Sequence, residues 1–264
     1  MRPKPPSGEI QSLGRAVAIL DCFRAHQPQL GVREIARQLD MSPSTVGRLL
    51  VTLCSLGILS QDPNTRLYRI GSKVLSWSAV YADTLDVREK ARPALEELHR
   101  LTHETVNLYI LDRDERVCVD RIESPQRLRV IVHIGERMPL HAGSAGKALL
   151  AFSHATLVKK IVSRRLEKLT NNTITNQNKL LNELKHVRQC GYAVSHAERF
   201  IDVIGLAAPI FDASGHVIAA LNVAGPTTRF TDARVEALAP QVIQLANQVS
   251  QSLGYVGSNL NPGE

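Results

Sequence analysis

The 264-residue sequence has few aromatic side chains, few cysteines and no long apolar run. Phe, Trp and Tyr make up 4% of the chain, so aliphatic side chains must form its hydrophobic cores. No apolar run approaches the ~20 residues that a membrane-spanning helix needs. Residues 1–9 lack the apolar core of a signal peptide. We therefore expect a cytoplasmic protein that does not enter a membrane.

The cysteines give no sign of a metal site or a disulfide framework. The chain has only Cys22, Cys54, Cys118 and Cys190, and no two of them form a C-x-x-C pair. Most of them fall within apolar helix or strand patterns, where a free thiol behaves as a small buried hydrophobe. This pattern is typical of reduced thiols in the cytosol.

Signatures of common enzyme classes are also missing. No G-x-S-x-G or H-E-x-x-H motif occurs, and Lys147 is followed by Ala148 where a phosphate-binding loop needs Ser or Thr. A catalytic or metal-binding interpretation must use polar residues without metal-ligand spacing, namely His133, His141, Cys190, His196 and Glu198. We expect no catalytic residue, no metal and no cofactor. A sensor domain with an enzymatic or metal-binding activity remains the alternative.

Charge is distributed unevenly along the chain. Lys and Arg number 32 and Asp and Glu number 25, which gives a net charge of +7. Residues 1–82 hold ten of the basic and five of the acidic side chains, a net charge of +5, and the remainder carries +2. A basic N-terminal part indicates contact with a polyanion such as DNA.

The most informative stretch of the sequence is 32–53, VREIARQLDMSPSTVGRLLVTL. Its apolar residues follow helical spacing from Val32 to Leu39 and again after Pro43. Ser42 followed by Pro43 is a strong helix-start signal, with Ser42 as N-cap. Two short helices joined by a tight turn form a helix-turn-helix, whose second helix presents its first turns to base edges and phosphates. The predicted DNA-contacting residues of this helix are Ser42, Ser44, Thr45 and Arg48.

A β-hairpin is predicted directly after this helix. Residues 58–61 and 66–70 alternate apolar and polar side chains around the turn cluster 62–65. A hairpin in this position is the wing of a winged helix-turn-helix, and its tip can contact the phosphate backbone. The candidate contacts are Asn64, Thr65 and Arg66, with a solvated hairpin tip as the equally weighted alternative.

The remaining sequence predicts a mixed helix and strand domain, so the fold class is α+β with two domains. Helices are expected over 13–25 with Ser12 as its cap, 71–83, 87–102 with a kink at Pro93, 156–165, 177–190 and 231–253. Strands are expected over 105–111, 116–122, 128–132, 192–196, 203–211 and 217–223. The small residues within 139–152 precede a helix and leave backbone N–H groups bare for an anion, although a junction without a ligand stays possible.

Several segments carry a resemblance to a known family. They are SLGRAVAILDCF, IARQLDMSPSTVGRLLVTLCSLGIL, YRIGSKVL, RMPLHAGSAGKALLAF and GYAVSHAERFIDVIGLAAPIFDASGHVIAALNVAGP. Together they closely resemble the isocitrate lyase regulator (IclR) family of bacterial transcription factors over about residues 10–253. The resemblance implies double-stranded operator DNA as a partner, a homodimer or dimer of dimers, and control by a small carboxylate or aromatic acid.

The resemblance also implies a domain division and a ligand site. It implies an N-terminal winged helix-turn-helix, a linker helix and a C-terminal GAF-like α/β effector-binding domain. The implied segments are a disordered arm 1–9, a winged domain 10–71, a linker helix 72–86, an effector domain 87–254 and a flexible tail 255–264. The effector-binding positions carried over are Ser144, Ala145, Ser195, Gly205, Asn222 and Ala224. A DNA-architecture protein without a sensing role is a third interpretation.

Overall fold

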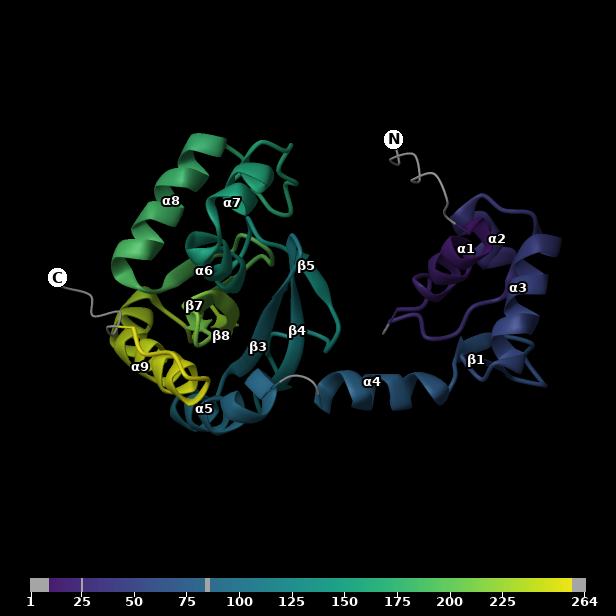
Figure 1. Cartoon of the computed structure of the whole chain (residues 1–264), viewed down its shortest axis with the longest axis horizontal. Helices are drawn as coiled ribbons and strands as arrows, with labels where there is room; N and C mark the ends of the chain where they lie inside the picture. The colour runs from purple at the N-terminus through teal and green to yellow at the C-terminus, as the bar shows by residue number, and fades with distance from the viewer. Residues whose placement is uncertain (1–9, 25, 84–85, 258–264) are drawn as a thin grey trace. The chain divides into compact units, whose positions relative to one another are not determined.

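The structure is a computed structural model of the chain, and it describes residues 10–24, 26–83 and 86–257. It divides into two compact units, one ending at Thr84 and the other beginning at Leu85 (Figure 1). The predicted arm 1–9 and residues 258–264 of the predicted tail lie outside the described residues. Among the helices described, none has the length and apolarity needed to cross a membrane.

The first unit consists of short helices and a two-stranded hairpin. Its elements are α1 (Gln11–Leu20), α2 (Val32–Leu39), α3 (Pro43–Ser55), β1 (Leu59–Gln61), β2 (Tyr68–Ile70) and α4 (Lys73–Asp83). The core forms where α1, α2, α3 and the hairpin meet, and Ile19, Ile35, Leu50 and Leu59 are buried there. The predicted helix-turn-helix and wing are therefore confirmed.

Local chemistry explains the sharp turn between α2 and α3. Asp40 ends α2 in the left-handed conformation with φ of 52°, which Asp tolerates better than most residues with a side chain. Ser42 then caps α3, because its Oγ accepts the N–H of Thr45 at 3.3 Å. Pro43 occupies the first helical position, where a missing N–H costs nothing.

Ser42→Ala should lower the free energy of unfolding of the first unit by about 1 kcal/mol, because α3 loses its capping acceptor. The change is measured by denaturant unfolding of the whole protein. Ser44→Ala is the matched control, since the Ser44 hydroxyl is equally close to the helix start but accepts no backbone N–H. An equal loss for both variants contradicts the capping role.

The first helix differs from its prediction at both ends. It begins at Gln11, and Ile10 stands at the N-cap without a side-chain hydrogen bond, so Ser12 is not the cap. It ends at Leu20 instead of continuing to residue 25, which lies outside the described residues. The chain turns there because the N–H of Cys22 bonds to the carbonyl of Ile19, which buries the Cys22 side chain in the core.

The second unit is built on a six-stranded antiparallel sheet in the order β5-β4-β3-β8-β7-β6. Its strands are β3 (Thr105–Asp112), β4 (Glu115–Ile122), β5 (Arg137–Pro139), β6 (Ala193–His196), β7 (Val203–Phe211) and β8 (Val217–Pro226). Its helices are α5 (Asp86–Thr102), α6 (Ser144–Phe152), α7 (Ala155–Val162), α8 (Gln177–Cys190) and α9 (Asp232–Ser252). Pro93 lies inside α5, and the kink expected there stays a prediction.

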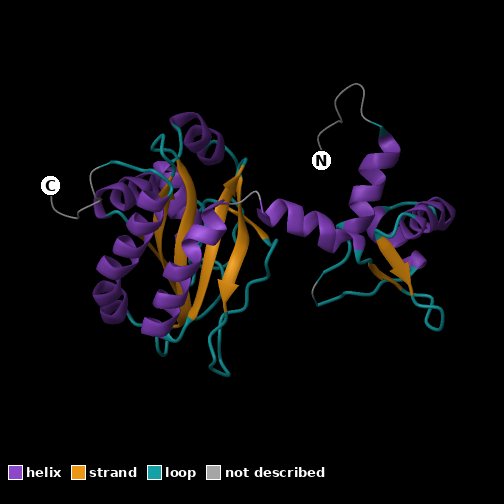
Figure 2. Ribbon diagram, turned by 60° about the horizontal axis from the view of Figure 1, so that its bottom comes forward, coloured by secondary structure: helices purple, strands orange, loops and turns teal. Residues whose placement is uncertain are grey.

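Helices cover both faces of this sheet (Figure 2). One apolar core joins α5 and α9 to alternate strand residues such as Leu108 and Leu221. The other joins α6, α7 and α8 to the opposite face, through residues such as Tyr109 and Ala220. The period-two alternation of side chains along each strand supplies both cores, and the structure is the predicted α+β class.

The strand predicted over 128–132 is wrong, and the edge strand is β5 instead. Val130 and Val132 are buried while Leu128 and Ile131 are exposed, so the segment alternates as a strand does. Side chains, however, take the carbonyls that a neighbouring strand would use. The three donors are Arg229 to Leu128 O, Thr105 to Val130 O and Arg121 to Val132 O.

Candidate functional site

The start of α3 carries the predicted base-reading residues on the surface of the first unit. Ser44 and Arg48 are exposed, and Thr45 is half-buried. The Ser42 hydroxyl is occupied within the chain, since it lies 3.1 Å from Ser44 Oγ and 2.8 Å from Thr45 Oγ1. No acidic side chain occurs along α3, so the positive end of its dipole is not neutralised from within the helix.

The tip of the hairpin is held by an aspartate. Asp62 Oδ1 accepts the backbone N–H groups of Asn64 at 2.8 Å and Thr65 at 2.9 Å. These two bonds, that of Thr65 first, lower the pKa of the Asp62 carboxyl. Arg66 follows in the left-handed conformation, and the side chains of Asn64, Thr65 and Arg66 are all exposed. The wing therefore presents one basic and two polar side chains to solvent.

The second unit contains a cavity of about 50 Å³ between the start of α6 and the sheet. All of the effector-binding positions carried over from the resemblance line it. They are Ser144, Ala145, Ser195, Gly205, Asn222 and Ala224. The register of β3, β8, β7 and β6 brings several of them together, since Asn222 pairs with Asn107, Ala224 with Gly205, and Gly205 with Ser195.

Free backbone N–H groups stand at the start of α6. The first backbone bond of the helix runs from Lys147 N–H to Gly143 O at 3.1 Å. Within the described residues, no group accepts the N–H of Ser144, Ala145 or Gly146. The N–H of Gly143 is used, because it donates to Glu198 Oε2 at 2.9 Å. Unpaired amides at a helix N-terminus are the ordinary receptor for a carboxylate or phosphate.

Glycines at this helix start make room for an arginine. A Cβ at Gly143 would lie 2.8 Å from Arg116 Nη2, and one at Gly146 would overlap Arg116 Nη1. A Cβ at Gly205 would similarly lie 2.6 Å from Ser144 Oγ. The small residues of the H-A-G-S-A-G-K segment therefore allow the Arg116 guanidinium and the Ser144 hydroxyl to approach the backbone closely.

Arg116 is a buried cation without an ion pair among the described residues. It is 2% exposed, and its Nη1 donates to Pro139 O at 2.8 Å and to Ala142 O at 2.5 Å. Its Nε is buried, and no residue that the structure describes forms a hydrogen bond with it. Burial lowers the pKa of Arg116 to about 10. Its charge therefore sits, uncompensated by a bonded carboxylate, beside the positive end of the α6 dipole.

Sequence reasoning missed part of the cavity wall. The missed lining residues are Asn107, Tyr109, Arg116, Val130, Val132, Gly143, Arg199, Phe200 and Val203. One sequence signal existed for Asn107, which interrupts the apolar run of β3 on the same face as Tyr109. No comparable signal exists for Arg116, which follows a charged turn and reads as a surface residue.

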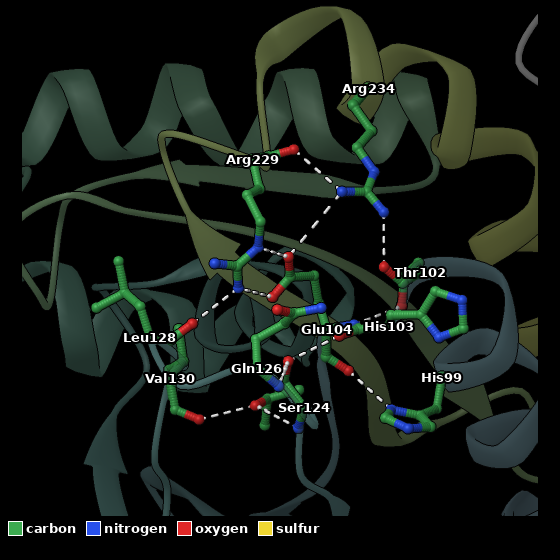
Figure 3. A network of polar contacts seen from close by, with 11 residues as sticks. His99, Thr102, His103, Glu104, Ser124, Gln126, Leu128, Val130, Arg229 and Arg234 are labelled. Carbon is green, nitrogen blue, oxygen red and sulfur yellow. Dashed lines mark hydrogen bonds and ion pairs between the residues drawn. The ribbon is translucent and has the colours of Figure 1, made fainter.

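A polar network fixes the loop that contains Val130, one of the residues lining the cavity (Figure 3). Its centre is the buried carboxylate of Glu104, which accepts from Arg229 Nε at 2.8 Å and Nη2 at 2.9 Å. Arg229 Nη2 also donates to Leu128 O at 2.8 Å, and Ser124 Oγ donates to His103 O at 2.7 Å. The network thus ties this loop to the start of β3 and to the segment after β8.

Of the residues that an enzyme would need, His196 and Glu198 line one pocket with Lys147, Glu183 and His186, and the others are not among its lining residues. His133 is exposed, and His141 is buried with Nε2 2.9 Å from Glu167 O. His196 lies at the surface 2.7 Å from Asp232, and Cys190 contacts His186 on α8. Glu198 alone approaches the cavity wall, where it pairs with Lys147 and caps Gly143. In the part of the chain that is described, no group of three or more His, Cys, Asp or Glu side chains is arranged to hold a metal ion.

A winged helix-turn-helix unit followed by an α/β unit with a polar cavity defines a class of bacterial transcription regulators. A family model described as "IclR helix-turn-helix domain" matches residues 12–63. A second model, "Bacterial transcriptional regulator IclR C-terminal", matches residues 79–251. The chain belongs to the IclR family of DNA-binding transcriptional regulators.

Named relatives and solved structures agree with this assignment. The HTH-type transcriptional regulator BhcR of Paracoccus denitrificans is 38% identical over 245 residues, 92% of this chain and 88% of that one. The crystal structure of an IclR transcriptional regulator from Alicyclobacillus acidocaldarius is 27% identical, covers 92% of this chain and 98% of its own, and has a TM-score of 0.81. An IclR homologue from Microbacterium hydrocarbonoxydans, complexed with 4-hydroxybenzoate, has the same fold at 24% identity, with coverage of 92% and 98% and a TM-score of 0.80.

Proposed function

We propose that this regulator binds double-stranded operator DNA through α3 and the wing, and that a small carboxylate in the cavity of the second unit changes its affinity for the operator. The observation that carries the ligand assignment is Arg116, a buried arginine next to the start of α6. No described residue forms an ion pair with it or accepts the neighbouring amides of α6. We assign residues 10–71 to DNA binding, 72–86 to the linker helix and 87–254 to effector binding.

The proposed DNA surface combines reading and anchoring residues. Ser44, Thr45 and Arg48 stand in the first turns of α3, the part of a recognition helix that reaches base edges. We assign Ser42 a mainly capping role, with phosphate contact through the same helix start. Asn64, Thr65 and Arg66 at the wing tip contact the phosphate backbone, which adds affinity without reading sequence.

Electrostatics favours an anion in the cavity. A buried charge without a partner is costly, and here the cost adds to that of a cation beside a helix N-terminus. A carboxylate bound at Ser144 and Ala145 offsets both of these electrostatic costs, because it accepts amide hydrogen bonds at the helix start and neutralises the charge of Arg116. A neutral or cationic ligand offsets neither of these two costs. The ligand class implied by the family resemblance, a carboxylate or aromatic acid, is therefore the one that this wall supports.

We propose no catalytic activity for this chain. The polar residues that chemistry would use are already engaged by other groups of the chain, with His141 on a backbone carbonyl, His196 on Asp232 and Glu198 on Lys147. The curated relatives are named as transcriptional regulators, and a regulator of operator DNA acts in the cytoplasm. A purely architectural role leaves the polar cavity without a use.

Self-association through helices of the first unit completes the proposal. On α4, Leu75, Trp77 and Val80 are 72%, 50% and 66% exposed, and on α1 the apolar Leu13 and Val17 are also exposed. Apolar helix faces of this kind mark protein contacts, and a dimer presents two winged units to two half-sites. We therefore propose a homodimer or a dimer of dimers.

Leu75→Glu should shift the protein toward the monomer, because it places a charge in the proposed apolar contact. The mass in solution is measured by sedimentation equilibrium over a range of concentrations. Ser78→Glu introduces the same charge at another exposed position of α4 and serves as the control. Unchanged mass for Leu75→Glu removes this helix from the interface.

Titration of the full-length protein with its own promoter fragment tests the proposed function. Binding is measured at several salt concentrations, because neutralised phosphates make log K fall linearly with log salt. The titration is repeated with a panel of small carboxylates, and melting curves report direct ligand binding. We expect salt-dependent operator binding that at least one carboxylate shifts. If the protein binds its promoter but no carboxylate changes its melting curve, the DNA-binding part of the proposal stands and the carboxylate part is wrong.

A further inference from the structure

Asn107 places an unused hydrogen-bond acceptor at the cavity wall. The residue lies in the middle of β3, is 0% exposed and lines the cavity. Its Nδ2 donates to Asn222 Oδ1 at 3.1 Å, whereas its Oδ1 is buried and has no partner in the described part of the chain. A buried carbonyl oxygen left unpaired loses its hydration without gaining a hydrogen bond, so an acceptor retained in this state requires an explanation.

The orientation of this amide is fixed by its neighbours. Asn222 Nδ2 lies 3.1 Å from the carbonyl of Leu206, and a backbone carbonyl can only accept. The Asn222 nitrogen therefore faces Leu206, and its oxygen faces Asn107. Only a nitrogen can donate to that oxygen, so Asn107 must turn its Nδ2 toward Asn222. Its Oδ1 is left as the atom without a partner, and rotating either amide would bring two acceptors together.

The same series of hydrogen bonds determines whether the Ser144 hydroxyl is available as a donor or as an acceptor. Asn222 Nδ2 donates to Ser144 Oγ at 2.9 Å, so the serine oxygen accepts and its own hydrogen is not used in that bond. No described residue accepts the Ser144 hydroxyl hydrogen. The cavity thus has donors at the start of α6, namely the Ser144 hydroxyl and free amides, and an acceptor on β3. The side chain of Asn222 lies between the Ser144 donor and the Asn107 acceptor and bonds to both residues.

We infer that the effector is a hydroxy carboxylate, whose carboxylate binds at Ser144 and Arg116 and whose hydroxyl donates to Asn107 Oδ1. The inference rests on the carboxylate proposed above and deepens it. An amino group could also donate to Asn107, but its positive charge would lie in the same small cavity as Arg116. A hydroxyl donates without that repulsion. The volume of about 50 Å³ favours a compact acid.

Matched pairs of probes test this assignment in the full-length protein. Isothermal titration compares lactate with propionate, malate with succinate, and 4-hydroxybenzoate with benzoate, so that each pair differs by one hydroxyl. We expect the hydroxy member of a binding pair to bind at least about tenfold more tightly, which corresponds to ~1.4 kcal/mol. Alanine, which replaces the hydroxyl of lactate by an ammonium group, should bind more weakly than lactate.

The ratio of the two affinities within a pair, that of the hydroxy acid to that of the acid without the hydroxyl, distinguishes recognition of the hydroxyl from a general loss of structure. Asn107→Ala removes the acceptor, so the ratio should fall to about one, whereas damage to the cavity would weaken both members together. Cys118→Ala truncates a buried side chain of the core on the same side of the sheet that does not line the cavity, and it should leave the ratio unchanged. A ratio of about one in the unmodified protein overturns the inference alone. If the ratio is kept in Asn107→Ala, or is lost in Cys118→Ala, Asn107 does not have the proposed role. Absence of binding by every probe overturns the carboxylate proposal, and this inference with it.

Discussion

Arg48→Ala should weaken binding to the specific operator by about 1–3 kcal/mol and relax the preference for one base position. Arg48 is exposed near the start of α3, and its side chain carries the only charge on that helix. An arginine in this place donates two hydrogen bonds to the major-groove edge of guanine, the commonest specific contact in such complexes. The measurement is gel-shift affinity for the operator and for a set of single-base variants.

Arg66→Ala is the matched control for this prediction. Arg66 is also an exposed arginine of the first unit, but it stands at the wing tip, where it faces the phosphate backbone in our proposal. Its loss should weaken binding about equally for all sequences and reduce the slope of log K against log salt by about 1. If Arg48→Ala leaves operator affinity unchanged, or acts equally on all sequences, Arg48 does not read a base.

The helix-turn-helix was predictable because its signals are local. Ser42 and Pro43 specify where α3 begins, and the apolar spacing after them specifies which side is buried. Such signals depend on residues three or four positions apart, which the sequence displays directly. The end of α1 was not predictable in this way, because the turn that buries Cys22 depends on the core of the whole unit.

Strand prediction failed where side chains replaced a neighbouring strand. The segment 128–132 alternates buried and exposed residues, which is the sequence property that predicts a strand. Its hydrogen-bond partners come from residues far along the chain, including Thr105 and Arg229. No local pattern reveals those partners. The edge strand β5 is only three residues long, which is too short to show an alternating pattern in the sequence.

The candidate effector site was predictable only where a family motif marks it. Ser144 and Gly205 belong to such motifs, and they line one cavity in the structure. Arg116 and Asn107 do not belong to such motifs, and each is revealed instead by a buried polar atom that has no hydrogen-bond partner among the described residues. Burial of a charged residue depends on which glycines lie opposite it, here Gly143 and Gly146, and this information exists only in the folded chain.

Arg116→Met should abolish carboxylate binding in the second unit while leaving operator binding in place. Methionine keeps much of the apolar stem but removes the cation, so a carboxylate that enters the cavity must be buried without its counter-charge. Removing one partner from a buried charge pair costs about 2–5 kcal/mol of affinity. The measurement is calorimetric titration with whichever carboxylate shifts the melting curve of the unmodified protein.

Arg199→Met is the control that makes this result specific. Arg199 lines the same cavity, but its guanidinium is already paired with the carboxylate of Glu136. Its loss should therefore weaken the ligand less than the loss of Arg116, whose charge has no bonded carboxylate in the free protein. Melting curves show whether both variants remain folded. Operator affinity should stay unchanged in both, because α3 and the wing belong to the other unit. Carboxylate affinity that survives in Arg116→Met but disappears in Arg199→Met would move the anion site away from the start of α6 and contradict the electrostatic argument.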